Sequence, residues 1–232
     1  MGTDVVLDLG WGRLVLGHTF GELAGILDVL RAEESGRRDI CIYPRDPHVL
    51  VGLAPDELFI DPSLTYRLDL HSYRPRQEPI RGVFVRTVTA LREMERINEL
   101  YARSGMVPGD PGTMWRNHRT RTFTYLVAED VRTREIVGTV TGVDHALAFG
   151  DPENGTGLWC LTADPQDAPP GTGEALVRVL AERYVARGRA YLDLSVMHDN
   201  EGAIALYRKL GFARVPAVCV KRKNPINTAL FT

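Results

Sequence analysis

The 232-residue chain has no long hydrophobic run, few cysteines and no excess of basic charge. A membrane-spanning helix needs about 20 consecutive apolar residues, and the sequence has none, so we expect no membrane segment. The odd number and wide spacing of Cys41, Cys160 and Cys219 indicate buried thiols in a reducing compartment. Neither the cysteines nor the six histidines show the spacing of a zinc site, so we predict no metal.

The balance of charge and the first residues exclude two further classes. Lys and Arg number 28 and Asp and Glu number 30, which gives a net charge of −2. A general nucleic-acid binder instead needs a strongly basic face. Residues 1–6 lack the basic and then apolar pattern of a signal peptide. The sequence therefore predicts a cytoplasmic protein with no nucleic-acid or membrane partner.

Alternating strand and helix patterns predict a mixed α/β fold. Two prolines within 72–80 indicate a crossing loop. We therefore divide the chain into an N-terminal α/β extension, a larger unit and a tail, at 1–80, 81–221 and 222–232. The extension is expected to hold a helix at 21–34 and strands at 14–16, 39–43 and within 56–70. The larger unit is expected to hold strands at 83–86, 123–129, 136–143, 158–163, 191–196 and 215–221, helices at 88–103, 113–119, 173–187 and 201–210, and a loop at 145–155.

A glycine-containing turn follows the strand predicted at 158–163. Gly171 and Gly173 lie where the next helix is expected to begin. Glycines let the backbone come close to a phosphate, and the first amides of a helix have no partner within it. The turn is therefore either an anion-binding loop or an ordinary connection between a strand and a helix.

A second motif occupies residues 200–212, Asn-Glu-Gly-Ala-Ile-Ala-Leu-Tyr-Arg-Lys-Leu-Gly-Phe. Asn200 suits the N-cap of a helix, and Gly211 suits the position just after its end. Ala203, Tyr207 and Leu210 would share one helix face. Taken alone, the pattern is that of an amphipathic helix with a buried tyrosine.

Together, the two motifs resemble those of the GNAT superfamily of acyl-CoA N-acyltransferases, and residues 81–221 fit the order of elements in that family. The resemblance implies a mixed β-sheet flanked by helices, with acetyl-CoA as co-substrate. In this family the strand before the loop splays from its neighbour and holds the pantetheine arm. The cofactor-binding positions that match are Leu161 and Ala163 on that strand, then Gly171, Thr172, Gly173, Glu174, Ala175 and Asn200. Ala168 and Pro169 stand where the family has Arg or Gln followed by Gly, so one contact to CoA is missing.

The resemblance also implies a reaction in which an amine attacks the thioester directly. Tyr207 matches the tyrosine that protonates the departing thiolate, so it is the predicted general acid. The attacking amine must be neutral, so a base or a water chain must accept its proton. The family has no fixed motif for this base. Asp144 and His145, at the end of a predicted strand, are our candidates, and the alternative is that each only caps a loop.

Residues 106–122 lie where this family builds its acceptor pocket. Arg116, Arg119 and Arg121 in that segment suit a carboxylate. We therefore expect a small-molecule amine acceptor such as an amino acid or a short peptide. The alternative is a solvated basic helix.

The tail and the extension resemble a narrower group, the acetyltransferase region of bacterial N-acetylglutaminylglutamine synthetases. That resemblance implies glutamine or glutaminylglutamine as the acceptor, and a fused or associated ATP-grasp ligase. The order of elements in the first 80 residues also echoes that of 158–212, which is the pattern of a degenerate half-GNAT. This half lacks both motifs, so we expect no CoA site in it.

Three functions therefore stay open. The first is an N-acetyltransferase acting on a small amine. The second is a non-catalytic GNAT-like module that binds acyl-CoA or a partner, which the altered loop at Ala168 and Pro169 favours. The third is a protein N-acetyltransferase. The arginines at 116–121 disfavour an aminoglycoside, because such a cationic acceptor needs an acidic pocket.

Overall fold

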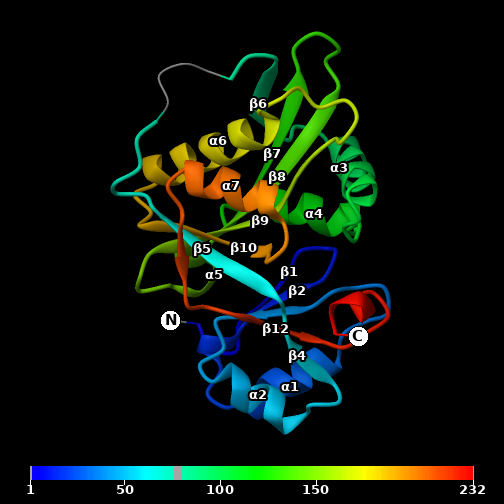
Figure 1. Ribbon diagram of the computed structural model, residues 1–232, viewed down its shortest axis with the longest axis vertical. Coiled ribbons are helices and arrows are strands. Elements are labelled where there is room, and N and C mark those ends of the chain that lie inside the picture. The colour runs from blue at the N-terminus through cyan, green and yellow to red at the C-terminus, as the bar shows by residue number, and fades with distance from the viewer. Residues whose placement is uncertain (1, 76–79, 232) are drawn as a thin grey trace.

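The structure is a computed structural model that describes residues 2–75 and 80–231, and it contains two β-sheets with helices packed on them (Figure 1). The larger sheet has seven strands in the order β11-β5-β10-β9-β8-β7-β6, and the smaller has five in the order β1-β2-β3-β12-β4. The predicted mixed α/β fold with flanking helices is therefore confirmed. Residues 76–79 of the predicted loop lie outside the described residues. In the part of the chain that is described, no helix has the length and apolar character needed to cross a membrane.

The larger sheet consists of β5 (Ser63–Asp69), β6 (Val83–Thr87), β7 (Phe123–Asp130), β8 (Ile136–Asp144), β9 (Gly155–Ala163), β10 (Tyr191–Met197) and β11 (Ala213–Val215). The smaller sheet consists of β1 (Val6–Asp8), β2 (Arg13–Leu16), β3 (Ile40–Ile42), β4 (Leu58–Ile60) and β12 (Cys219–Arg222). The helices are α1 (Leu23–Arg31), α2 (Pro47–Leu53), α3 (Leu91–Arg103), α4 (Pro111–His118), α5 (His145–Phe149), α6 (Thr172–Ala186) and α7 (Glu201–Lys209), with 3₁₀ turns at Gly17–Thr19 and Thr228–Leu230.

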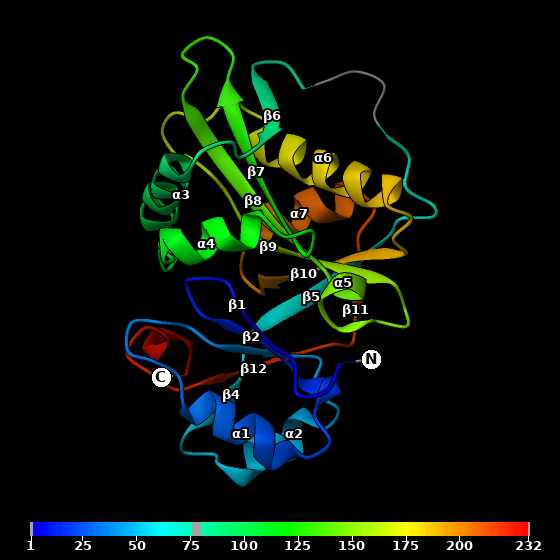
Figure 2. The same ribbon diagram turned by 180° about the vertical axis from the view of Figure 1, so that it is seen from behind.

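The larger sheet is covered on both faces. Successive side chains of a strand point to opposite faces, and β7 shows both environments. Leu126 and Ala128 pack in a core with residues of α6 and α7, whereas Tyr125 and Val127 pack with α3, α4 and one face of the smaller sheet. Figures 1 and 2 show α6 and α7 on one side of the larger sheet and α3 on the other. The second face of the smaller sheet packs against α1 and α2.

Each sheet takes a strand from the other part of the chain. β5, from the predicted extension, lies between β10 and β11 in the larger sheet, and β12 lies between β3 and β4 in the smaller sheet. The sheets therefore do not follow the predicted boundaries at residues 80 and 221. The prediction of one strand at 215–221 is wrong, because β11 and β12 belong to different sheets. The predicted loop at 145–155 begins with the short helix α5.

The smaller sheet repeats the topology of part of the larger one. Along β1-β2-β3-β12-β4 the pairings are antiparallel, parallel, antiparallel and antiparallel. The same senses occur in the same order along β8-β9-β10-β5-β11. In chain order, α1 and α2 correspond to α6 and α7. This correspondence supports the predicted degenerate half-GNAT, which is called the half-copy below. The exchanged strands β12 and β5 occupy equivalent places in the two sheets.

Polar contacts also join the two sheets. The Tyr43 hydroxyl, directly after β3, donates a hydrogen bond of 2.8 Å to Asp193 on β10. Arg67 on β5 donates to both carboxylate oxygens of Asp193, at 2.8 and 2.9 Å. Asp193 is buried, so its charge depends on these partners.

Replacement of Tyr43 tests this contact. Tyr43→Phe should lower the free energy of unfolding by about 1–2 kcal/mol, because the substitution removes a hydrogen bond to a buried carboxylate. Tyr66→Phe is the matched control, since the hydroxyl of this buried tyrosine has no hydrogen-bond partner among the described residues. Urea denaturation of both variants measures the difference, and equal losses would contradict the role given to Tyr43.

Candidate functional site

The larger sheet contains a fork between β9 and β10. The two strands pair in parallel only at Gly155–Gly157 and Tyr191–Asp193, and no pairing joins their described residues beyond that point. A cavity of about 520 Å³ lies in the fork, lined by 158–163 of β9 and 195–197 of β10. This volume is in the usual range for a site that binds a small molecule. The expected splay of the strand before the glycine turn is confirmed.

A β-bulge accompanies the fork. Thr139 and Thr141 of β8 face Thr162 and Trp159 of β9, so β9 has one extra residue between these pairs. Cys160 lies in the bulge with a φ of 50°, in the left-handed region that residues other than glycine seldom adopt. A bulge bends its strand, and this one lies where β9 is no longer paired with β10.

The glycine turn leads into α6 as predicted. Gly171 is the N-cap of α6 with a φ of 90°, and Gly173 in the first turn lines the cavity. The Thr172 amide and hydroxyl both donate to the Pro169 carbonyl, at 3.2 and 2.7 Å. The Ala175 amide donates to the Gly171 carbonyl at 2.9 Å. Of the predicted loop residues 171–175, Gly173 is the one that lines the cavity.

The turn before α6 is held by a buried carboxylate. Asp164 is 2.7 Å from Arg103 and 3.5 Å from Arg96, and it also accepts a hydrogen bond from the Gln166 amide. The Ala168 amide donates to the Asp164 carbonyl at 3.1 Å. These contacts fix the shape of the turn.

Helix α7 brings the second motif to the same cavity. Asn200 caps the helix by accepting from the Ala203 amide at 3.1 Å, and Asn200, Ala203 and Tyr207 all line the cavity. Lys209 is 2.6 Å from Glu174, which fastens α7 to α6. Burial raises the pKa of Tyr207, so its phenol stays protonated at neutral pH, as a proton donor requires. The structure thus brings together Leu161, Ala163, Gly173, Asn200 and Tyr207.

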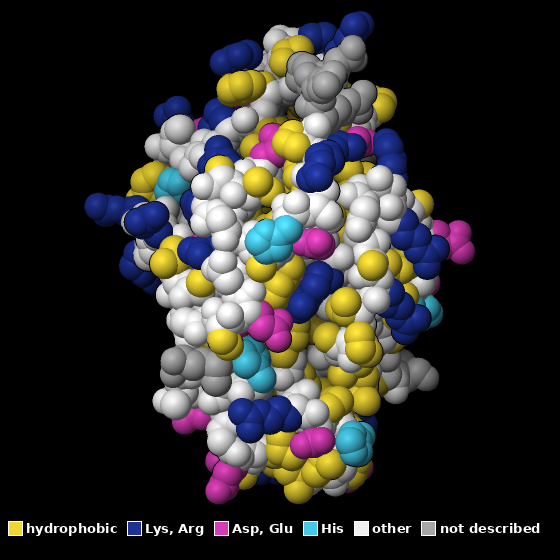
Figure 3. All heavy atoms as spheres, turned by 90° about the vertical axis from the view of Figure 1, so that its left-hand side faces the viewer, with side chains coloured by type: hydrophobic (Ala, Val, Ile, Leu, Met, Phe, Trp, Pro, Cys, Tyr) yellow, Lys and Arg dark blue, Asp and Glu magenta, His cyan; other side chains and the backbone are white. Residues whose placement is uncertain are grey.

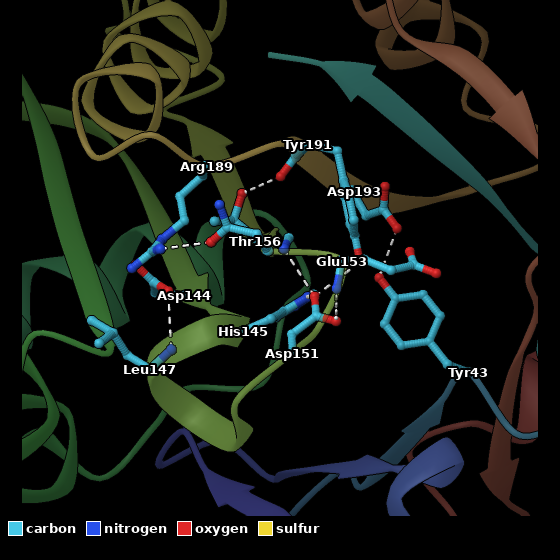
Figure 4. A network of polar contacts seen from close by, with 12 residues as sticks. Tyr43, Asp144, His145, Leu147, Asp151, Glu153, Thr156, Arg189, Tyr191 and Asp193 are labelled. Atoms are coloured by element: carbon cyan, nitrogen blue, oxygen red, sulfur yellow. Dashed lines mark hydrogen bonds and ion pairs between the residues drawn. The ribbon is translucent and has the colours of Figure 1, made fainter. Parts of the chain in front are cut away.

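The two candidate bases differ in their surroundings (Figure 4). Asp144 is fully buried, caps α5 through the Leu147 amide, and is 2.9 Å from Arg189. Its carboxylate is thereby committed to structural contacts. His145 lies with its Nδ1 3.9 Å from the Asp151 carboxylate. Burial lowers the pKa of His145 to about 4, against the opposing effect of Asp151, so the imidazole is neutral at pH 7 and is also a weaker base than an exposed histidine.

His145 lines a second cavity of about 290 Å³, together with Tyr43, Asp151 and Glu153. The face shown in Figure 3 carries acidic, basic and histidine side chains close together near its centre. A Cβ placed on Gly157 would lie 3.0 Å from His145 Nε2 and 2.9 Å from Trp159 Nε1, so the imidazole lies against this glycine. A space of about 10 Å³ shares Trp159 with the large cavity and Tyr43 with the second one, and this is about the room that one water needs.

The three arginines predicted to bind the acceptor lie elsewhere. Arg116 is on α4, and Arg119 and Arg121 follow it, and all three are exposed. The Arg116 guanidinium donates to Thr113 on the same helix at 2.7 Å. None of the three is among the lining residues of the large cavity, so their role in substrate binding stays a prediction.

The structure adds cavity residues that the motifs did not indicate. The smaller sheet and the segments next to it contribute Trp11, Arg38, Ile40, Asp61, Cys219 and Lys221, and the first residue of β5 contributes Ser63. These residues lie outside both motifs, and no local pattern marks them. They reach the cavity because β5 and β12 are exchanged between the sheets.

Solved structures share this fold over almost the whole chain. A GCN5-related N-acetyltransferase from Sphaerobacter thermophilus has a TM-score of 0.59 at 17% identity, over 94% of this chain and 75% of that one. A GCN5-related N-acetyltransferase from Kribbella flavida has a TM-score of 0.59 at 14% identity, over 98% of this chain and 93% of that one. A tandem GNAT protein from the clavulanic acid biosynthesis pathway has a TM-score of 0.58 at 14% identity, over 87% of this chain and 67% of that one. The chain therefore shares its fold with these proteins.

The family follows from the sequence match. The model of the Acetyltransferase (GNAT) family matches residues 94–212, slightly more than half of the chain. The chain therefore belongs to the GNAT family of acetyltransferases, which typically use acetyl-CoA. No curated protein matches the chain.

The buried imidazole of His145 predicts a pH dependence of stability. Its folded pKa of about 4 lies below the usual 6.5, so the unfolded chain binds more protons between these values and stability falls as the pH falls. Between pH 7 and pH 5 this one group should cost about 2 kcal/mol. Urea denaturation at both pH values should show that His145→Gln weakens the dependence and that His48→Gln, at an exposed position on α2, leaves it unchanged. An unaltered dependence in His145→Gln would contradict the burial of a neutral imidazole.

Proposed function

We propose that this chain transfers the acetyl group of acetyl-CoA to the amine of a small amino acid or dipeptide, with Tyr207 as the general acid. The observation that carries this proposal is that Tyr207 of α7, its N-cap Asn200, Gly173 of α6 and the part of β9 not paired with β10 line one cavity. The three elements supply a proton donor, a helix N-terminus and free strand backbone, which are the groups that thioester aminolysis needs.

Each of these groups has a chemical task in the proposed reaction. Backbone groups of β9 beyond Gly157 would bind the pantetheine arm of the donor, and the first turn of α6 would bind its pyrophosphate. When the amine attacks, negative charge develops on the carbonyl oxygen, where strand amides can stabilise it. The C–S bond then breaks, and the Tyr207 hydroxyl gives its proton to the sulfur. The phenolate regains a proton from solvent.

The proton of the attacking amine requires an acceptor. We propose His145 for this role, through water in the narrow space beside Gly157 and Trp159. Asp144 remains a candidate from the sequence, although its contacts with Leu147 and Arg189 occupy its carboxylate. Water-mediated transfer needs no direct contact between the base and the amine.

The structure favours a small acceptor over a protein one. The smaller sheet forms a wall of the cavity through residues such as Trp11 and Ile40, and we take a walled cavity to suit a small molecule better than an extended peptide chain. Glutamine and glutaminylglutamine are the first acceptors to test, as the sequence resemblance proposes, and an associated ATP-grasp ligase belongs to the same proposal.

A non-catalytic acyl-CoA-binding module is the second candidate. Pro169 and Pro170 have no amide hydrogen, and Thr172 already uses its amide in a bond to Pro169. The turn therefore offers the donor fewer contacts than a glycine-rich loop does. Measured turnover separates the two candidates, because both bind acyl-CoA and one acetylates an amine.

Replacement of Tyr207 tests the catalytic assignment. Tyr207→Phe should lower kcat about a hundredfold, because the general acid is lost, while the Kd of acetyl-CoA measured by calorimetry should stay the same. Thiol release from acetyl-CoA with glutamine or glutaminylglutamine reports the turnover. Tyr66→Phe, a buried tyrosine of β5 away from the cavity, is the control and should keep full activity. Equal turnover in Tyr207→Phe and the control would remove Tyr207 as the acid.

Replacement of Gly173 tests the donor site. A Cβ at Gly173 meets only Leu206, at 3.7 Å, so a side chain fits without disturbing the fold. Gly173→Glu should weaken acetyl-CoA binding at least tenfold, a change of roughly 1.4 kcal/mol, because a carboxylate would face the pyrophosphate. Gly52→Glu, on α2 with open space around it, is the control. Unchanged affinity of Gly173→Glu in calorimetry would place the donor elsewhere.

A further inference from the structure

The smaller sheet meets the fork at its bulge. The rings of Trp11, before β2, and Trp159, on β9, have centroids 6.3 Å apart. The Arg38 amide donates to the Trp11 carbonyl at 3.1 Å, so Arg38 lies beside this contact. Trp11, Arg38, Trp159 and Cys160 all line the large cavity.

The cavity wall formed by the smaller sheet has a net charge of one positive unit, because it contains Arg38, Lys221 and Asp61. Lys221 and Asp61 are buried and only 2.7 Å apart, so their charges compensate each other. The neighbouring Asp39 is 2.6 Å from Arg13. Arg38 has no ion pair with the described residues, and its buried Nε has no hydrogen-bond partner among them. A partly buried guanidinium without an acceptor is a site prepared for an anion.

The charge of Arg38 extends to the bulge of β9. Burial raises the pKa of the Cys160 thiol, and the positive charge of Arg38 opposes that rise. Arg38 and Cys160 also line the same cavity, so the guanidinium faces the part of β9 that is no longer paired with β10. Tyr207 comes to the cavity from α7, which packs on the other face of the larger sheet.

We propose that Arg38 binds a carboxylate of the acceptor, so that the N-terminal half-copy supplies the acceptor site while the C-terminal half supplies the donor site. This inference rests on the proposed function and names its substrate class, an amine that carries a carboxylate. The acceptor then approaches from the smaller sheet and the donor from the α6 and α7 side. A guanidinium pairs with a carboxylate through two parallel hydrogen bonds, which also orients the amine.

Paired acceptors test the inference directly. Wild-type protein is assayed with glutamine, glutaminylglutamine and a panel of other amino acids, each beside its C-terminal amide. We expect each accepted amino acid to have a KM roughly tenfold to a hundredfold below that of its amide, the size of one lost hydrogen bond between charged groups. Arg38→Gln should raise the KM of the acid to that of the amide and leave the Kd of acetyl-CoA unchanged. Arg38→Lys keeps the charge but cannot form two parallel hydrogen bonds with a carboxylate. Its KM for the acid should therefore lie between those of the wild type and Arg38→Gln.

Several outcomes would overturn the inference, and they differ from failure of the proposed function. Amides accepted as well as acids, or turnover only of amines without a carboxylate, would leave the acetyltransferase intact and remove the role of Arg38. If Arg38→Gln raises the Kd of acetyl-CoA and leaves the KM of the acceptor unchanged, Arg38 binds a phosphate of the donor instead. A raised KM in Arg116→Ala but not in Arg38→Gln would place the carboxylate on α4. No binding of acetyl-CoA to the wild type would instead contradict the proposed function.

Control variants separate these outcomes from general effects of a substitution. Arg92→Gln, at an exposed position of α3 that does not line the large cavity, makes the same chemical change and should alter neither KM nor Kd. Thermal unfolding of Arg38→Gln checks that the fold persists. If that variant does not fold, the paired acids and amides with wild-type protein still decide whether a carboxylate is recognised.

Discussion

The exchange of β5 and β12 fixes how the two halves of the chain face each other. Each exchanged strand is hydrogen-bonded on both sides within the sheet of the other half. The halves therefore cannot separate without breaking four ladders, and backbone bonds in a sheet are costly to leave unmade. This constraint holds one face of the smaller sheet against the larger one, and it makes a single cavity from residues as distant in sequence as Trp11 and Lys221.

The same topology gives a cavity in one half and a closed sheet in the other. β3 is paired with β2 along all three of its residues, from Ile40 to Ile42. β9 is longer, is bulged at Cys160, and leaves β10 after Gly157. Strand length and one extra residue therefore decide where backbone groups are available for a ligand. The loss of the fork from the N-terminal half turns its sheet into a wall, and this wall is where we place acceptor recognition.

Local chemistry made much of the fold predictable. The cap at Asn200, the positive φ of Gly171 and Gly211, and the helical periodicity of 200–212 each depend on a few neighbouring residues. The exchange was not predictable, because β5 and β10 are separated by more than a hundred residues and no local pattern selects the partner. One signal was available: Pro216 cannot donate to a ladder, and it lies between β11 and β12 where the sequence suggested one strand. Arg38 carried no signal, since only tertiary packing distinguishes it from the other arginines.

The turn before α6 shows how the family's chemistry can tolerate a departure from its usual loop. Asp164, with Arg103 and Arg96, holds the turn from outside the cavity, and prolines restrict it further. A preorganised turn loses little entropy when a ligand binds, which offsets part of the missing contact at Ala168 and Pro169. In the proposed function, binding of the donor then relies more on the backbone of β9 than on the phosphate loop. We infer that such a site selects its donor by the pantetheine arm, and that arm is common to every acyl-CoA.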